Sequence, residues 1–131
     1  MSREIQPELW VSDGPAAVTF YERAFGAAVE HRVDGPGEGD VIAQLNAGGA
    51  RFWVSNGSKP MGRFTPDGIG GATGRMLLVT DDPKALLAAA VAAGAAETSA
   101  VQDEHGWRLG RFTDPFGHQW EVGHPLGEWP P

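Results

Sequence analysis

The side chains of this sequence that could do chemistry are tryptophans placed beside charged and amide residues. A strand's two-residue period puts such side chains on one face of three separate stretches: Gln6, Glu8 and Trp10; Arg51, Trp53 and Ser55; Gln119 and Glu121. Indole rings stack on planar molecules, and charged groups orient the polar ends of those molecules. The pattern therefore predicts recognition of a planar ligand. Trp120 alternates with Glu121 and is expected in the core.

Other kinds of site find little support. The chain has no cysteine, which removes disulfides, thiolate zinc sites and a cysteine nucleophile. The four histidines are not paired at metal-binding spacing, and no serine has an evident histidine partner. The glycine-rich run at 68–71 precedes a predicted strand rather than a helix, so it is not a phosphate-binding loop.

Composition and net charge disfavour some classes of binding partner. The formal net charge is −7, which disfavours nucleic acid and anionic membranes as partners. The N-terminal residues lack the apolar region of a signal peptide, and no run approaches the roughly 18 apolar residues that a membrane span needs. We expect a cytoplasmic protein that binds neither nucleic acid nor membrane.

Two similar segments are expected to position these faces. Each has a short apolar strand, an acidic N-cap, a helix of about three turns and a glycine at the helix end. Asp13 lies thirteen residues before Gly26, and Asp81 lies thirteen before Gly94, with Asp81 or Asp82 as the second cap. Aspartate accepts hydrogen bonds from the first turn, and glycine adopts the left-handed conformation that ends a helix.

Strand-like runs follow each helix, which gives a βαβββ pattern twice. The runs are 28–33, 41–45 and 51–55, then 95–101, 107–113 and 119–123. Asp114 and Gly117 are expected to set the last hairpin. We expect one domain, with a first module at about 4–55, a linker and lid at 56–73, a second module at about 74–124 and a tail at 125–131.

Several of these motifs resemble the vicinal oxygen chelate superfamily of glyoxalases, bleomycin resistance proteins and extradiol dioxygenases. Residues 113–122 resemble its terminal DP-x-G-x-x-x-E hairpin, residues 20–27 and 92–95 its two helix ends, and residues 48–52 a further turn. The resemblance covers residues 5–125. It implies an α+β fold in which two tandem βαβββ modules form a curved mixed sheet around a cleft, usually in a homodimer.

Enzymes of this superfamily hold a divalent metal with four inward His, Glu or Gln side chains. The resemblance carries two of these positions to Gln6 and Glu121, which fit. It carries the other two to Trp53 and to either Gly74 or Arg75, none of which ligates a divalent cation. The intact metal site is therefore not expected.

Glu8 is the one further side chain that could join the metal ligands, because it shares a strand face with Gln6. Gln6, Glu8 and Glu121 would form a weak oxygen set suited at best to Mg²⁺ or Mn²⁺. With Arg75 nearby, we expect an internal ion pair instead. No cofactor is expected, and Glu121 is the best candidate for a catalytic group.

The leading hypothesis is a small-molecule-binding protein, without the full metal site, that holds a planar or aromatic ligand in a tryptophan-lined cleft. Its expected ligand contacts are Trp10, Arg51, Trp53, Arg75, Trp107 and Glu121. Two alternatives stay open. One is a divergent lyase, isomerase or dioxygenase that uses a divalent metal. The other is a structural homodimer whose cleft is vestigial and whose tryptophans fill the interface.

Overall fold

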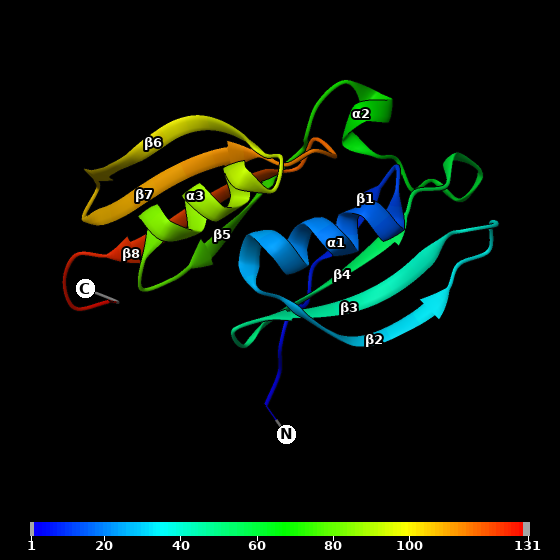
Figure 1. The fold of residues 1–131 in the computed structure, drawn as a ribbon, viewed down its shortest axis with the longest axis horizontal. Helices are drawn as coiled ribbons and strands as arrows, with labels where there is room; N and C mark the ends of the chain where they lie inside the picture. The colour runs from blue at the N-terminus through cyan, green and yellow to red at the C-terminus, as the bar shows by residue number, and fades with distance from the viewer. Residues whose placement is uncertain (1, 130–131) are drawn as a thin grey trace.

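The computed structural model describes residues 2–129, which form two βαβββ modules joined by a folded linker (Figure 1). The first module contains β1 (Glu8–Val11), α1 (Gly14–Phe25), β2 (Ala28–Asp34), β3 (Val41–Ala47) and β4 (Ala50–Asn56). The second contains β5 (Arg75–Val79), α3 (Pro83–Ala92), β6 (Ala96–Glu104), β7 (Trp107–Thr113) and β8 (Gln119–Pro125). The predicted α+β architecture is confirmed.

The two long helices begin at the expected caps. Asp13 Oδ1 accepts a hydrogen bond from the backbone of Ala16 at 3.1 Å, and Gly26 ends α1 with a φ of 63°. In the second module the cap is Asp82, whose Oδ1 accepts from the backbone of Ala85 at 3.1 Å. Repetition of the capped helix therefore reflects a true structural repeat.

The strands form two four-stranded mixed sheets, in the orders β1-β4-β3-β2 and β5-β8-β7-β6. The innermost pair of each sheet, β1 with β4 and β5 with β8, is parallel, and the other pairs are antiparallel. Each βαβββ module thus contributes one four-stranded mixed sheet. The strands at the facing edges are β1 and β5. Among the described residues, each pairs only within its own sheet, so no strand pairing connects the two sheets.

One hydrophobic core lies between the inner faces of the two sheets. The ring of Phe52 on β4 lies 5.7 Å from that of Trp120 on β8, and Tyr21 of α1 lies 5.2 Å from Phe52 and 5.7 Å from Trp120. Such edge-to-face and tilted contacts are favourable arrangements of aromatic rings. Trp120 is 4% exposed, which confirms its predicted place in the core. The opposite faces of the two sheets therefore point away from each other.

A buried carboxylate connects the two modules within this core. Asp114, just before the last hairpin, accepts hydrogen bonds from the Tyr21 hydroxyl and from Trp120 Nε1 at 3.0 Å. Its other oxygen accepts from the backbone N–H groups of Phe116 and His118 at 2.9 and 3.0 Å. Burial, together with the charge of Asp114, raises the pKa of the Tyr21 hydroxyl well above its ordinary value. Asp114 thus sets the hairpin, as expected, and also binds α1 of the first module.

The segment between the modules is folded. It contains a short 3₁₀ turn at Lys59–Met61 and α2 (Pro66–Ile69), whose cap is Thr65. Pro66 is buried against the last hairpin: a Cβ added at Gly117 would lie 2.8 Å from Pro66 Cβ. The expectation that this segment acts as a lid stays a prediction. No helix in residues 2–129 has the length and apolar character to cross a membrane.

Candidate functional site

The side chains predicted to line one cleft lie on the outer faces of two different sheets. The first face, on the sheet of β1–β4, carries Gln6, Glu8, Trp10, Gln44, Arg51, Trp53 and Ser55. The second face, on the sheet of β5–β8, carries Arg75, Leu77, Val79, Trp107, Leu109, Arg111, Glu121 and Gly123. Within residues 2–129, no hydrogen bond or ion pair joins the two faces.

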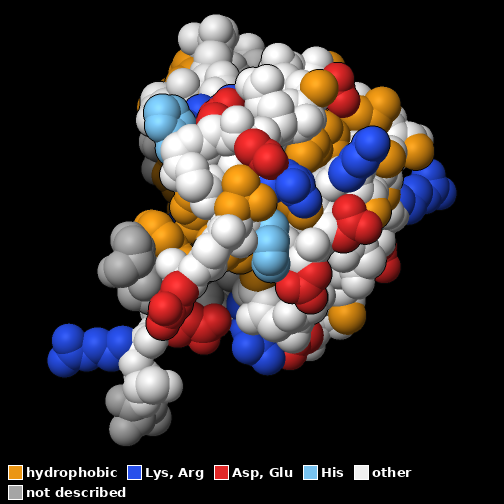
Figure 2. Space-filling view, turned by 90° about the vertical axis from the view of Figure 1, so that its left-hand side faces the viewer, with side chains coloured by type: hydrophobic (Ala, Val, Ile, Leu, Met, Phe, Trp, Pro, Cys, Tyr) orange, Lys and Arg blue, Asp and Glu red, His pale blue; other side chains and the backbone are white. Residues whose placement is uncertain are grey.

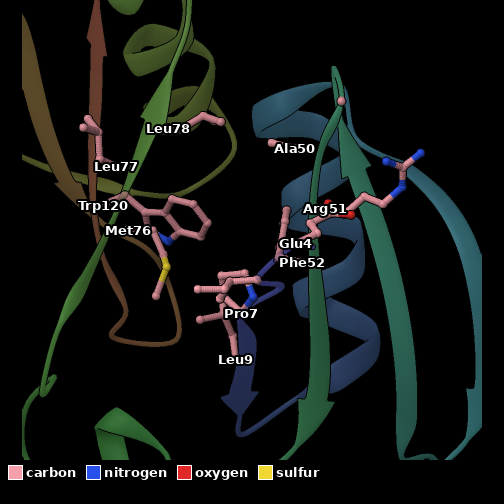
Figure 3. A pocket seen from close by; sticks show the side chains of 12 residues that line it. Glu4, Pro7, Leu9, Ala50, Arg51, Phe52, Met76, Leu77, Leu78 and Trp120 are labelled. Atoms are coloured by element: carbon pink, nitrogen blue, oxygen red, sulfur yellow. The ribbon is translucent and has the colours of Figure 1, made fainter. Parts of the chain in front are cut away.

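Figure 3 shows why one chain does not bring these residues together. Trp120 and Met76 point into the space between the sheets, whereas the Arg51 guanidinium extends away from it. Alternation then places Trp53 on the same outer side as Arg51. A small planar ligand cannot touch both faces of a single chain.

Three neutral side chains of the first face form a hydrogen-bonded group, the neutral triad: Gln6, Gln44 and Trp53. Gln6 Oε1 accepts from Trp53 Nε1 at 2.8 Å and from Gln44 Nε2 at 2.9 Å. The extended backbone places Gln6 there, since Pro7 O accepts from the backbone N–H of Trp53 at 2.7 Å. An indole N–H can only donate, so the orientation of the Gln6 amide is fixed. Its oxygen is occupied, and its NH₂ group is what it can offer to a ligand.

Trp10 is anchored in a similar way beside the neutral triad. Its Nε1 donates to Glu8 at 2.7 Å, and Ser55 Oγ lies 3.5 Å from the same carboxylate oxygen. Trp10 and Trp53 are both half-buried, so part of each ring meets solvent. Arg51 lies two residues before Trp53 on β4 and pairs with Glu30 at 3.0 Å. The first face is therefore an aromatic wall whose polar groups are largely engaged with one another.

The second face carries a charged counterpart, the charged triad: Arg75, Arg111 and Glu121. Arg111 Nε donates to Glu121 Oε2 at 2.8 Å, while Arg75 Nε lies 3.2 Å from Oε1. Arg111 also bonds Glu104, and this hydrogen bond is the main cause that lowers the Glu104 pKa and raises the Arg111 pKa. The ion pair expected beside Arg75 is present, and Arg75 rather than Gly74 stands at the site.

An apolar floor adjoins the charged triad. A Cβ added at Gly123 would lie 2.5 Å from Leu109, 3.2 Å from Leu77 and 3.3 Å from Trp107, so these side chains close over the glycine. Leu77 is 44% exposed although it lies in the middle of a strand. The Trp107 ring packs edge-on against Trp129 of the tail, with 5.1 Å between centroids. The second face thus combines a charged part with an exposed hydrophobic part.

These residues do not fit a divalent metal. The Gln6 carbonyl oxygen already accepts two hydrogen bonds, and both oxygens of Glu121 face guanidinium groups. Glu8, the weak third candidate, already accepts hydrogen bonds from Trp10 Nε1 at 2.7 Å and from Ser55 Oγ at 3.5 Å. In the part of the chain that the structure describes, no cluster of three or more His, Asp or Glu side chains could hold a metal ion.

A separate apolar cleft, which the sequence does not predict, lies between the sheets. It has a volume of about 270 Å³ and opens where the start of β4 faces β5 (Figure 3). Its walls are core side chains: Leu9, Phe52, Met76, Leu78 and Trp120. Elsewhere, acidic and basic side chains are interspersed with hydrophobic ones, as the side view in Figure 2 shows.

Comparisons with known proteins agree with this fold. Residues 5–122 match the family described as the Glyoxalase/Bleomycin resistance protein/Dioxygenase superfamily. An uncharacterized protein of Mycobacterium bovis is 34% identical over 131 residues, covering 95% of this chain and 84% of the relative. The solved structure of an Arabidopsis thaliana gene product is 33% identical with a TM-score of 0.69, covering 93% of this chain and 97% of that one. TioX from Micromonospora sp. ML1 is 27% identical with a TM-score of 0.73, covering 95% and 100%.

Proposed function

The chain belongs to the glyoxalase/bleomycin resistance protein/dioxygenase superfamily, and from this premise we propose that it is a metal-independent small-molecule-binding protein for a planar or aromatic ligand. The observation that carries the proposal is that the oxygen atoms that could ligate a metal already have partners within the chain. The Gln6 oxygen and the Glu121 carboxylate are both engaged by donors of this chain, while the neighbouring indole rings remain partly exposed.

The tryptophans of the first face are suited to stacking because they are held in place before a ligand arrives. Each indole N–H is anchored, Trp53 by Gln6 and Trp10 by Glu8. An anchored ring loses little conformational freedom when a planar molecule packs on it, so more of the contact energy contributes to affinity. The ring surfaces that meet solvent supply the apolar contact area.

We further propose that two copies of the chain complete the site as a homodimer. The two faces of one chain point apart, so a ligand on Trp53 is open to solvent on its other side. A twofold operation brings the first face of each copy against the second face of its partner and closes two equivalent sites. The exposed Leu77 and Val79, 44% and 56% accessible, support burial of the second face in this way.

Replacement of Trp53 tests the aromatic wall. With 2-naphthamide as a neutral planar probe, followed by tryptophan fluorescence, Trp53→Ala should weaken binding roughly 10- to 100-fold while costing little thermal stability. Met61→Ala, which removes an exposed apolar side chain from the linker, should leave the affinity unchanged. Equal loss of affinity and stability would instead assign Trp53 to the core, and unchanged affinity would remove it from the site.

Metal content and mass test the rest of the proposal. Elemental analysis of protein purified without chelator or affinity tag should find no stoichiometric Mn, Fe, Co, Ni, Zn or Mg. Near one metal per chain, lost in Glu121→Gln, would overturn the proposal in favour of a metal-dependent lyase, isomerase or dioxygenase. Sedimentation equilibrium should give a dimer, and a monomer that still binds the probe would refute the shared site.

A further inference from the structure

The arginines of the second sheet differ in how their guanidinium groups are used. Arg108 donates to Asp103 through Nε at 2.9 Å and through Nη2 at 3.4 Å. Arg111 donates to Glu121 and Glu104. The Arg75 guanidinium makes no hydrogen bond within the described range 2–129, although its Nε lies 3.2 Å from Glu121. The planar set of N–H donors on Arg75 is therefore available.

The charge of Arg75 is also the less well compensated of the two in the triad. Glu121 forms its hydrogen bond with Arg111, so Arg75 holds only an ion pair with a shared carboxylate. The Glu121 side chain is 11% exposed and that of Arg75 is 51% exposed. Glu121 thus lies against the Nε end of the guanidinium, and the exposure of the Arg75 side chain leaves its other N–H groups accessible to a ligand.

The apolar floor begins beside this arginine. Leu77 follows Arg75 on the same strand face, about 6–7 Å farther along β5. Leu109 and Trp107 continue the floor over Gly123. A free guanidinium at one end of an apolar floor matches a molecule with an acid group attached to a flat ring system of about two fused rings.

We propose that the ligand is an aromatic acid whose carboxylate binds the outer N–H groups of Arg75 and whose ring lies on Leu77 and Leu109. This inference names the ligand class of the proposed function and rests on it. A carboxylate accepts two parallel hydrogen bonds from a guanidinium, and such charge-assisted bonds are stronger than bonds to a neutral carbonyl. A cationic ligand is disfavoured, because the charge of the exposed Arg75 guanidinium is compensated only by the shared Glu121 carboxylate.

Three probes of one shape but different charge test the inference: 2-naphthoate, 2-naphthamide and 2-naphthylmethylammonium, titrated by tryptophan fluorescence near neutral pH and low salt. The wild-type protein should bind the acid about 10- to 100-fold more tightly than the amide, and the ammonium most weakly. Arg75→Gln should remove the preference for the acid and leave the affinity for the amide unchanged. Arg75→Lys, which keeps the charge but loses the planar donor set, should retain part of the preference.

Arg108→Gln is the matched control, because Arg108 is also 51% exposed and lies on the same sheet but already donates to Asp103. It should leave the affinities for all three probes unchanged. Equal binding of acid and amide by the wild type, or a preference for the acid that survives in folded Arg75→Gln, would overturn the inference while the proposed function stands. Failure of all three probes to bind would count against both.

Discussion

The two outer faces use the same strand geometry with different chemistry. On each face one side chain supplies an acceptor and two neighbours direct N–H groups towards it: Gln6, just before β1, in the neutral triad, and Glu121 on β8 in the charged triad. In the neutral triad the opposed residues of β4 and β3, Trp53 and Gln44, are both donors, whereas the opposed residues of β8 and β7 are the acceptor Glu121 and the donor Arg111. The repeated backbone thus brings three side chains together on each face, while the residue types decide which one accepts and whether the contact carries charge.

The difference in charge predicts a difference in what each triad contributes to stability. The neutral triad places no net charge in a half-buried position, so removal of its acceptor costs the hydrogen bonds alone. When the acceptor of the charged triad is removed, Arg75 loses its counter-ion and Arg111 keeps only Glu104. Three variants test this comparison, and they are given from the largest expected effect to the smallest.

Glu121→Gln should have the largest effect. The substitution keeps the size of the side chain but removes the charge, and it turns an amide NH₂ towards a guanidinium. We expect the free energy of unfolding to fall by about 2 kcal/mol, as is usual for hydrogen bonds to charged groups. Urea denaturation measures this value. Gln119→Ala, at an exposed position on the same strand, should change it by less than about 0.5 kcal/mol.

Gln6→Ala should cost less, about 1 kcal/mol, because the Trp53 indole N–H and the Gln44 amide lose a neutral acceptor. The same urea titration serves, with the exposed Gln119→Ala again as its control. If Gln6→Ala and Glu121→Gln lower the free energy of unfolding equally, then charge adds nothing to the second triad and the comparison fails.

Acidification should affect the second face selectively. The hydrogen bond from Arg111 lowers the pKa of Glu104 in the folded protein below its unfolded value. Its stabilising contribution is therefore complete above the unfolded pKa and is lost as the pH falls through the folded pKa. Below about pH 4.5, Glu104→Gln should lose less stability than wild type on further acidification. Asp67, whose pKa is lowered by Thr65, supplies an acid dependence common to both proteins.

Gln6→Ala provides the contrast for that pH series, because the neutral triad has no group that titrates in this range. Its thermal midpoint should fall with pH in parallel with that of wild type. A Glu104→Gln profile that also runs parallel to wild type would show that Arg111 does not hold the Glu104 carboxylate in solution.

Much of the fold could be predicted because local sequence determines local structure. Asp13 and Gly26 are visible as the two ends of α1, and the strand predicted at 107–113 is β7, Trp107–Thr113. Alternation also placed Trp53 and Trp120 on the correct faces of their strands. These features depend on neighbouring residues, so one sequence is enough to find them.

The arrangement of the site depends on contacts between distant residues, which alternation does not specify. A strand's period tells which face a side chain takes, but not whether that face meets another face of the same chain or one of a second copy. The shared cleft predicted for Trp53 and Arg75 therefore stays a prediction. Arg111 was missed because its link to Glu121 follows from the register of β7 on β8. The available signal was the two-residue period, which places Arg111 on one strand face with Leu109 and Thr113.

The contact between Tyr21 and Asp114 makes the two halves of this repeat unlike. Tyr21 belongs to α1 and Asp114 to the hairpin of the second module, and each is almost completely buried. At the corresponding place α3 carries Ala90, also fully buried. A chain made of two first modules would bury two tyrosine hydroxyls without Asp114, and one made of two second modules would bury two carboxylates without a tyrosine. Neither module can therefore replace the other, because this buried contact needs one residue from each.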